Sequence, residues 1–161
     1  MRRNFPAILM LCVLLVLSAW PQVGDEGGRV RYARYTSYFE KNDSGLKGGT
    51  SFLVFTSQPD FDRVFGPAAV MGRNSFLPAG TFQTKIVVAS IRRGNFFRSY
   101  EVKKVTKKDG KLYVWYSVKD SKPGSAMYNS PLMLAVAKGD YSSVVFMQDG
   151  TEAGVVPAPK P

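Results

Sequence analysis

The chain of 161 residues contains no histidine and a single cysteine, Cys12. Ser-His-Asp and Cys-His catalytic sites need an imidazole to move the proton, so neither can be built here. A structural zinc site normally needs four Cys or His ligands, and the sequence does not supply them. Acidic residues do not cluster as a calcium site requires. We therefore expect a protein without enzymatic activity, bound metal or cofactor.

Long apolar runs are also lacking. The longest covers residues 7–17, follows Arg2 and Arg3, and precedes the small residues Ser18 and Ala19. A basic start, a short apolar run and small residues are typical of a secretory signal peptide. A membrane-spanning helix would need roughly 20 apolar residues. We predict a signal peptide over residues 1–19 and export to the periplasm, the cell surface or the medium. The alternative is an uncleaved segment that anchors the chain in the membrane.

The rest of the chain alternates apolar and polar residues with period two, which predicts a mainly β fold. Residues 111–119 show this best, because Leu112, Val114, Tyr116 and Val118 share one face. A second strand is predicted over residues 99–106. The dipeptide Asp109-Gly110 between them favours a two-residue hairpin turn with positive φ at both positions.

Further strands are predicted over residues 30–40, 51–56 and 82–92, and the nearly continuous apolar run of the last indicates burial on both faces. Residues 131–138 and 143–148 are expected to pair as a hairpin. One short helix is predicted after Ser57, because Pro59 and Asp60 suit its first turn. We expect a small antiparallel sheet or sandwich with one short helix.

The predicted order is a signal peptide over 1–19, an N-terminal segment with a strand over 20–50, a β-rich domain over 51–150, and a Pro-rich disordered tail over 151–161. Three prolines in the last five residues favour disorder there, because proline lacks the N–H that a sheet needs.

One predicted loop combines arginines with adjacent aromatic residues. The candidate partner-binding residues are Arg92, Arg93, Phe96, Phe97 and Arg98. Successive strand residues face opposite ways, so the two phenylalanines cannot easily enter one core. Arginine and aromatic residues are enriched at binding hot spots, so we expect the rings to be apolar anchors while Arg93 and Arg98 pair with a partner's carboxylates. Alternatively, the loop is an ordinary sheet rim with one ring buried and the other half-covered.

Positive charge exceeds negative charge, with 22 Lys and Arg against 12 Asp and Glu and a net charge of +10. It is densest on the predicted hairpin, at Lys103, Lys104, Lys107, Lys108 and Lys111. These lysines could bind a polyanion such as an anionic lipid or an acidic glycan. They could instead be a solvated hairpin end that discourages edge-to-edge strand pairing.

An ordered pattern runs through residues 82–149. It comprises strand 85–91 with a Gly-bearing loop, Tyr100-Glu101-Val102 before a charged hairpin, strand 112–118, Lys122-Pro123-Gly124-Ser125, and the run 130–136. In this pattern the chain resembles the C-terminal domain family of PrcB, a protease complex subunit. The resemblance implies a non-catalytic, β-rich module of an exported protein. The family's namesake is a lipoprotein that helps to assemble a surface serine protease complex.

Together these observations predict an exported, non-catalytic module that binds or assembles with another exported or envelope protein, with a protease as the partner that the resemblance suggests. Nucleic acid is not expected as a partner, since no phosphate-binding loop or RNA-binding motif is present. Two alternatives are a polyanion-binding envelope protein and a protease inhibitor whose loop fills an active-site cleft.

Overall fold

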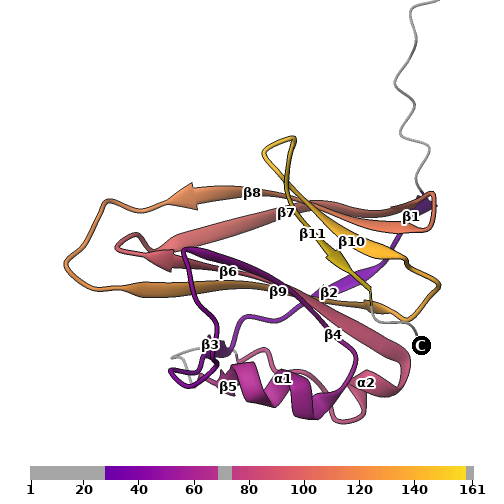
Figure 1. Cartoon of the computed structure of the whole chain (residues 1–161), viewed down its shortest axis with the longest axis horizontal. Coiled ribbons are helices and arrows are strands. Elements are labelled where there is room, and N and C mark those ends of the chain that lie inside the picture. The colour runs from indigo at the N-terminus through magenta and orange to yellow at the C-terminus, as the bar shows by residue number, and fades with distance from the viewer. Residues whose placement is uncertain (1–27, 69–73, 159–161) are drawn as a thin grey trace, which may run out of the picture.

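A computed structural model of the chain describes residues 28–68 and 74–158 (Figure 1). The predicted signal peptide lies outside the described residues. The fold is mainly β, as predicted, and most strand pairs are antiparallel. Figure 1 shows three layers: a five-stranded sheet, a four-stranded sheet, and a layer with two short helices and a two-stranded sheet.

The five-stranded sheet has the order β1-β7-β8-β10-β11. Its strands are β1 (Gly28–Arg29), β7 (Arg98–Lys108), β8 (Lys111–Asp120), β10 (Ser143–Gln148) and β11 (Thr151–Pro157). The four-stranded sheet has the order β2-β9-β6-β4. Its strands are β2 (Tyr32–Arg34), β9 (Tyr128–Ala137), β6 (Lys85–Gly94) and β4 (Thr50–Phe55). The two-stranded sheet pairs β3 (Tyr38–Glu40) with β5 (Phe65–Pro67). The described part of segment 20–50 thus belongs to the same sheets as the β-rich domain.

The four-stranded sheet is buried on both faces. Towards the five-stranded sheet, Ile86 and Val88 join a core that includes Leu112, Val114 and Phe146. On the other face the buried residues include Phe61, Phe65, Val87, Ala89 and Ile91, under the helical layer. Burial on both faces explains the nearly continuous apolar run of β6 and confirms that prediction.

The predicted hairpin is confirmed. β7 and β8 are antiparallel, and Asp109 and Gly110 take φ values of 50° and 71° at the turn. On β8, Leu112, Val114 and Tyr116 are buried, whereas the alternate residues Tyr113 and Trp115 are only partly covered.

The predicted helix is confirmed as α1 (Gln58–Val64), capped by the Ser57 hydroxyl, which accepts from the Asp60 N–H. A second helix, α2 (Thr81–Thr84), occupies the predicted start of strand 82–92, so β6 begins at Lys85. A single helical turn is too short to show a 3.6-residue period, which is why the sequence pattern missed it. Neither helix in the described part of the chain is long and apolar enough to cross a bilayer.

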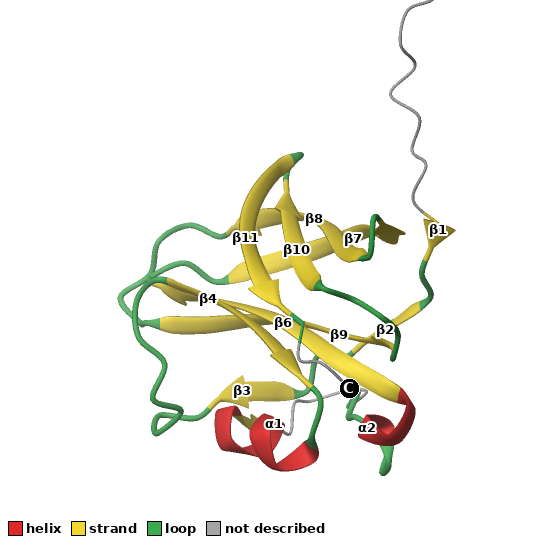
Figure 2. Cartoon of the chain, turned by 45° about the vertical axis from the view of Figure 1, so that its right-hand side comes forward, coloured by secondary structure: helices red, strands yellow, loops and turns green. Residues whose placement is uncertain are grey.

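Two predictions about the C-terminal region were wrong. Residues 131–138 and 143–148 do not pair: β9 lies in the four-stranded sheet, and β10 lies parallel to β8 in the other sheet (Figure 2). Alternation marks strands but does not identify their partners. Residues 151–157 are not a disordered tail but strand β11, antiparallel to β10. β11 is an edge strand that ends at Pro157, and at an edge the missing proline N–H removes no hydrogen bond between strands.

Gly154 closes the sandwich where β11 meets β4. A Cβ atom at this position would lie 2.4 Å from Cδ2 of Phe52, a distance that real contacts do not reach. The Phe52 ring also packs against Phe146, the cross-strand partner of Gly154 on β10, with ring centroids 4.8 Å apart. Glycine is therefore needed here for close approach rather than for backbone freedom.

Gly154→Ala should lower the free energy of unfolding by about 1–3 kcal/mol, because the added methyl group overpacks the Phe52 ring. Urea denaturation followed by circular dichroism measures this change. Gly49→Ala is the control, since nothing lies within 4 Å of the added carbon there. Equal stability of the two variants would contradict the packing role of Gly154.

Candidate functional site

The predicted partner-binding loop connects β6 to β7 and is tied to the loop that follows β8. The Phe97 N–H donates to Ser121 Oγ at 3.0 Å, and the Ser121 N–H donates to the Phe97 carbonyl at 2.9 Å. The Gly124 N–H donates to the Asn95 carbonyl at 2.7 Å. Both loops lie at the same end of the sandwich, opposite the β7–β8 turn (Figure 1). These bonds make the two loops one ordered surface.

The three predicted arginines flank the loop, with Arg92 and Arg93 at the end of β6 and Arg98 at the start of β7, and they bind groups of their own chain. Arg93 forms a bidentate ion pair with Glu40, with N–O distances of 2.6 and 2.8 Å, and the Glu40 side chain is 3% exposed. Arg98 Nε lies 3.1 Å from Asp120 Oδ1, and Arg92 donates to the Gln148 side chain. Arg93 and Arg98 therefore do not offer unpaired guanidinium groups to a partner, contrary to the sequence-based expectation.

The two phenylalanines differ sharply in exposure. Phe96 is partly buried, with the Arg98 guanidinium 5.5 Å from its ring centroid. Phe97 is 57% exposed and meets Tyr128 edge-on, with centroids 6.1 Å apart. Met127 lies in the loop that follows β8, directly before Tyr128 at the start of β9, and it is 74% exposed. We call Phe97, Met127 and Tyr128 the apolar tip.

The five predicted polyanion-binding lysines lie at two places along the β7–β8 hairpin. Lys107, Lys108 and Lys111 lie at or beside the β7–β8 turn, and Lys107 stands over the Tyr141 ring. Lys103 and Lys104 lie farther along β7 at a bulge, where Lys103 has no partner residue on β8. Lys103 pairs with Glu101 at 2.6 Å, and the Lys104 ammonium lies 5.0 Å from the Trp115 ring centroid.

The structure brings two further cations to the bulge. Arg29 and Arg31 line a surface hollow together with Lys103 and Lys104, although more than 70 positions separate the two pairs in sequence. Sequence analysis missed these arginines. The alternation Arg29-Val30-Arg31-Tyr32 was the available signal, since it places two arginines on one face of an extended chain.

Two tyrosines buried in the sandwich have raised pKa values. Desolvation by burial raises the pKa of Tyr100 well above its usual range, so the phenol stays protonated and donates to the Ser130 carbonyl at 2.8 Å. Burial also raises the pKa of Tyr116. Among residues 28–68 and 74–158, no group of three or more His, Cys, Asp or Glu side chains could hold a metal ion.

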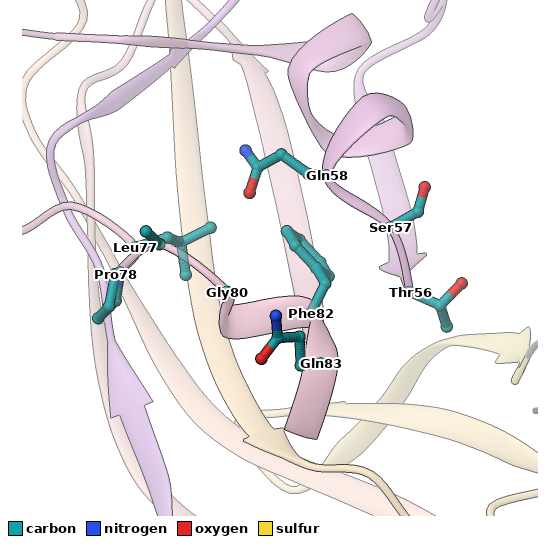
Figure 3. A pocket seen from close by; sticks show the side chains of 9 residues that line it. Thr56, Ser57, Gln58, Leu77, Pro78, Gly80, Phe82 and Gln83 are labelled. Atoms are coloured by element: carbon teal, nitrogen blue, oxygen red, sulfur yellow. The ribbon is translucent and has the colours of Figure 1, made fainter.

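A cleft of about 730 Å³ opens between α1, α2 and the segment before α2 (Figure 3). Figure 3 shows the Phe82 ring between the side chains of Gln58 and Gln83. The described residues that line the cleft include no ionisable side chain, and the Ser57 hydroxyl there donates to the Asp60 carboxylate at 2.6 Å. The described lining therefore offers mainly apolar and amide contacts.

Arg93→Ala should lower the free energy of unfolding by about 3–5 kcal/mol, because it leaves the buried Glu40 carboxylate without its charge partner. Arg63→Ala is the matched control: its ion pair with Asp60 joins side chains that are 70% and 54% exposed. The loss there should stay below about 1 kcal/mol. Chemical denaturation of both variants tests the difference, and similar losses would contradict a structural role for Arg93.

Comparison with known proteins gave no match: no protein-family model, curated protein or solved structure is similar to this chain. The resemblance to the PrcB C-terminal domain family therefore stays a prediction from the sequence pattern.

Proposed function

We propose that this chain is an exported, non-catalytic module that binds another exported or envelope protein through the apolar tip. The observation that carries the proposal is the exposure of Phe97 and Met127, at 57% and 74%, on loops that are otherwise well hydrogen-bonded. Large apolar side chains grouped on a surface are typical of protein interaction sites.

The internal ion pairs support this role indirectly. Arg93 and Arg98 fix the two ends of the β6–β7 loop to Glu40 and Asp120. A loop that is already ordered loses little conformational entropy on binding, so more of the contact energy appears as affinity. The arginines thus position the tip instead of contacting the partner.

The absence of histidine from the whole chain, with Cys12 as its single cysteine, supports a binding role over catalysis. A protease remains the partner that the PrcB-like pattern suggests. Simple association is distinguished from inhibition by whether the captured protease keeps its activity.

Phe97→Ala combined with Met127→Ala should weaken partner binding by about 2 kcal/mol or more, as expected for truncated hot-spot residues. The measurement is crosslinking of the tagged chain to envelope and secreted proteins, with washes at low and high salt, followed by a binding titration with the recovered partner. A single stoichiometric partner that survives high salt and is lost with the double variant is the expected result.

Val155→Ala is the matched control, because Val155 is 48% exposed but lies on β11, away from the tip. It should retain the partner. Loss of a cooperative thermal melt in the Phe97 and Met127 variant would assign these side chains to the core. Equal capture by both variants would reject the apolar tip as the contact surface.

A further inference from the structure

The edge of the sandwich beside β7 has a separate site, built where the N-terminal chain changes sheets. β1 pairs with β7 in the five-stranded sheet, and three residues later β2 pairs with β9 in the four-stranded sheet. The crossing is held by the Val30 N–H, which donates to the Val105 carbonyl at 2.8 Å. Next to it, the β7 bulge inserts Lys103 as an extra residue. A bulge bends the strand and increases its twist, which opens the sheet edge at this point.

Two hollows meet at the bulge. The first, of about 550 Å³, is lined by Arg29, Arg31, Tyr32, Lys103 and Lys104, together with Val30 and Val105. The second, of about 270 Å³, shares Lys103 and Lys104 and adds the Trp115 ring and Met147. We call the two together the corner groove.

The corner groove is strongly cationic. Among the residues that the structure describes, four cations and no carboxylate line the first hollow. Glu101 neutralises Lys103 from outside it, and Asp149 lines the second hollow. The side chains of Arg29 and Arg31 are exposed and make no ion pair or hydrogen bond with any other residue that the structure describes. Like charges held together in a concave surface repel one another and attract anions.

We propose that the corner groove binds an acidic polysaccharide, a chain of sugar units that carry carboxylate or sulfate groups. Such a chain presents its negative charges at regular intervals, which suits cations spread over two adjoining hollows. Its hydroxyl and ring groups suit the partly apolar surface that Tyr32 and Met147 provide. The predicted export of the chain places it where such glycans occur.

The geometry favours this ligand over nucleic acid. Binding of single-stranded nucleic acid relies on aromatic faces that are open for bases to stack on. The Lys104 ammonium stands over the Trp115 ring, and Trp115 Nε1 is held by the Thr106 hydroxyl at 3.3 Å. Trp115 therefore positions the Lys104 ammonium and does not offer that ring face to a base. A flat lipid surface is also a poorer fit, because the cations line hollows and do not project from a plane.

The test compares two variants with the same loss of charge. Arg29→Gln with Arg31→Gln alters the corner groove, and Lys108→Gln with Lys111→Gln alters the end of the β7–β8 hairpin. All four side chains are exposed, so both variants should fold, and thermal melts check this. A Trp20→Phe background leaves Trp115 as the single tryptophan, whose fluorescence reports binding.

The probes are an oligogalacturonate, dextran sulfate and uncharged dextran, each titrated at several salt concentrations. We expect an acidic glycan to bind and to change Trp115 emission, with affinity that falls as salt rises. The groove variant should lose about tenfold or more in affinity, whereas the hairpin variant should lose only a few-fold. Uncharged dextran should not bind.

Equal losses in the two variants would mean attraction to net charge alone and would overturn the proposal. So would the absence of binding by both acidic glycans. Tighter binding of single-stranded oligothymidylate or of phosphatidylglycerol vesicles through the same arginines would replace the glycan with that ligand. The Phe97 and Met127 variant should bind the glycan normally, so this test is independent of the apolar tip.

Discussion

The structure depends on the burial of both faces of the four-stranded sheet. Its central strands, β6 and β9, place alternate side chains in two different cores. The sheet is therefore stable only when the five-stranded sheet covers one face and the helical layer covers the other. The same alternation continues to the end of β6, where Arg92 reaches Gln148 on one side and Arg93 reaches Glu40 on the other. The two cores thus determine where the loop after β6 begins.

Local sequence patterns predicted the elements that local physics controls. The Asp109-Gly110 turn, the faces of β8 and the Ser57-capped helix all depend on residues close together in the chain. The pairing of strands, in contrast, depends on residues that are far apart in the chain. A crossing from one sheet to the other separates β9 from β10, and nothing in their alternation distinguishes this from a hairpin. The prolines near the C-terminus indicated disorder, but β11 reaches Pro157 and includes it as its last residue, where a sheet edge tolerates it.

The candidate surfaces also combine features that the local sequence predicts with features that depend on distant residues. Adjacent phenylalanines on a strand-like segment indicated that the two rings would not easily share one core, and they do differ, since Phe96 is partly buried and Phe97 is exposed. The ion pair of Arg93 could not be predicted from the sequence pattern, because its partner Glu40 lies 53 positions away in the chain. The corner groove is equally non-local, since it joins residues 29–32 to a bulge in β7 that the alternation does not mark. Charge density along the sequence therefore pointed to the hairpin end, whereas the fold gathers cations at the sheet edge.

The parallel pairing of β8 with β10 has a consequence for how the chain folds. The connection between these strands includes β9, which pairs in the four-stranded sheet. Docking of β10 against β8 therefore closes a long loop, which costs chain entropy before any contact compensates for it. Until then the β8 edge is unpaired and open to strands from other molecules. We expect the rate of this docking, more than the stability of the finished sandwich, to set how long newly made chains remain prone to aggregation.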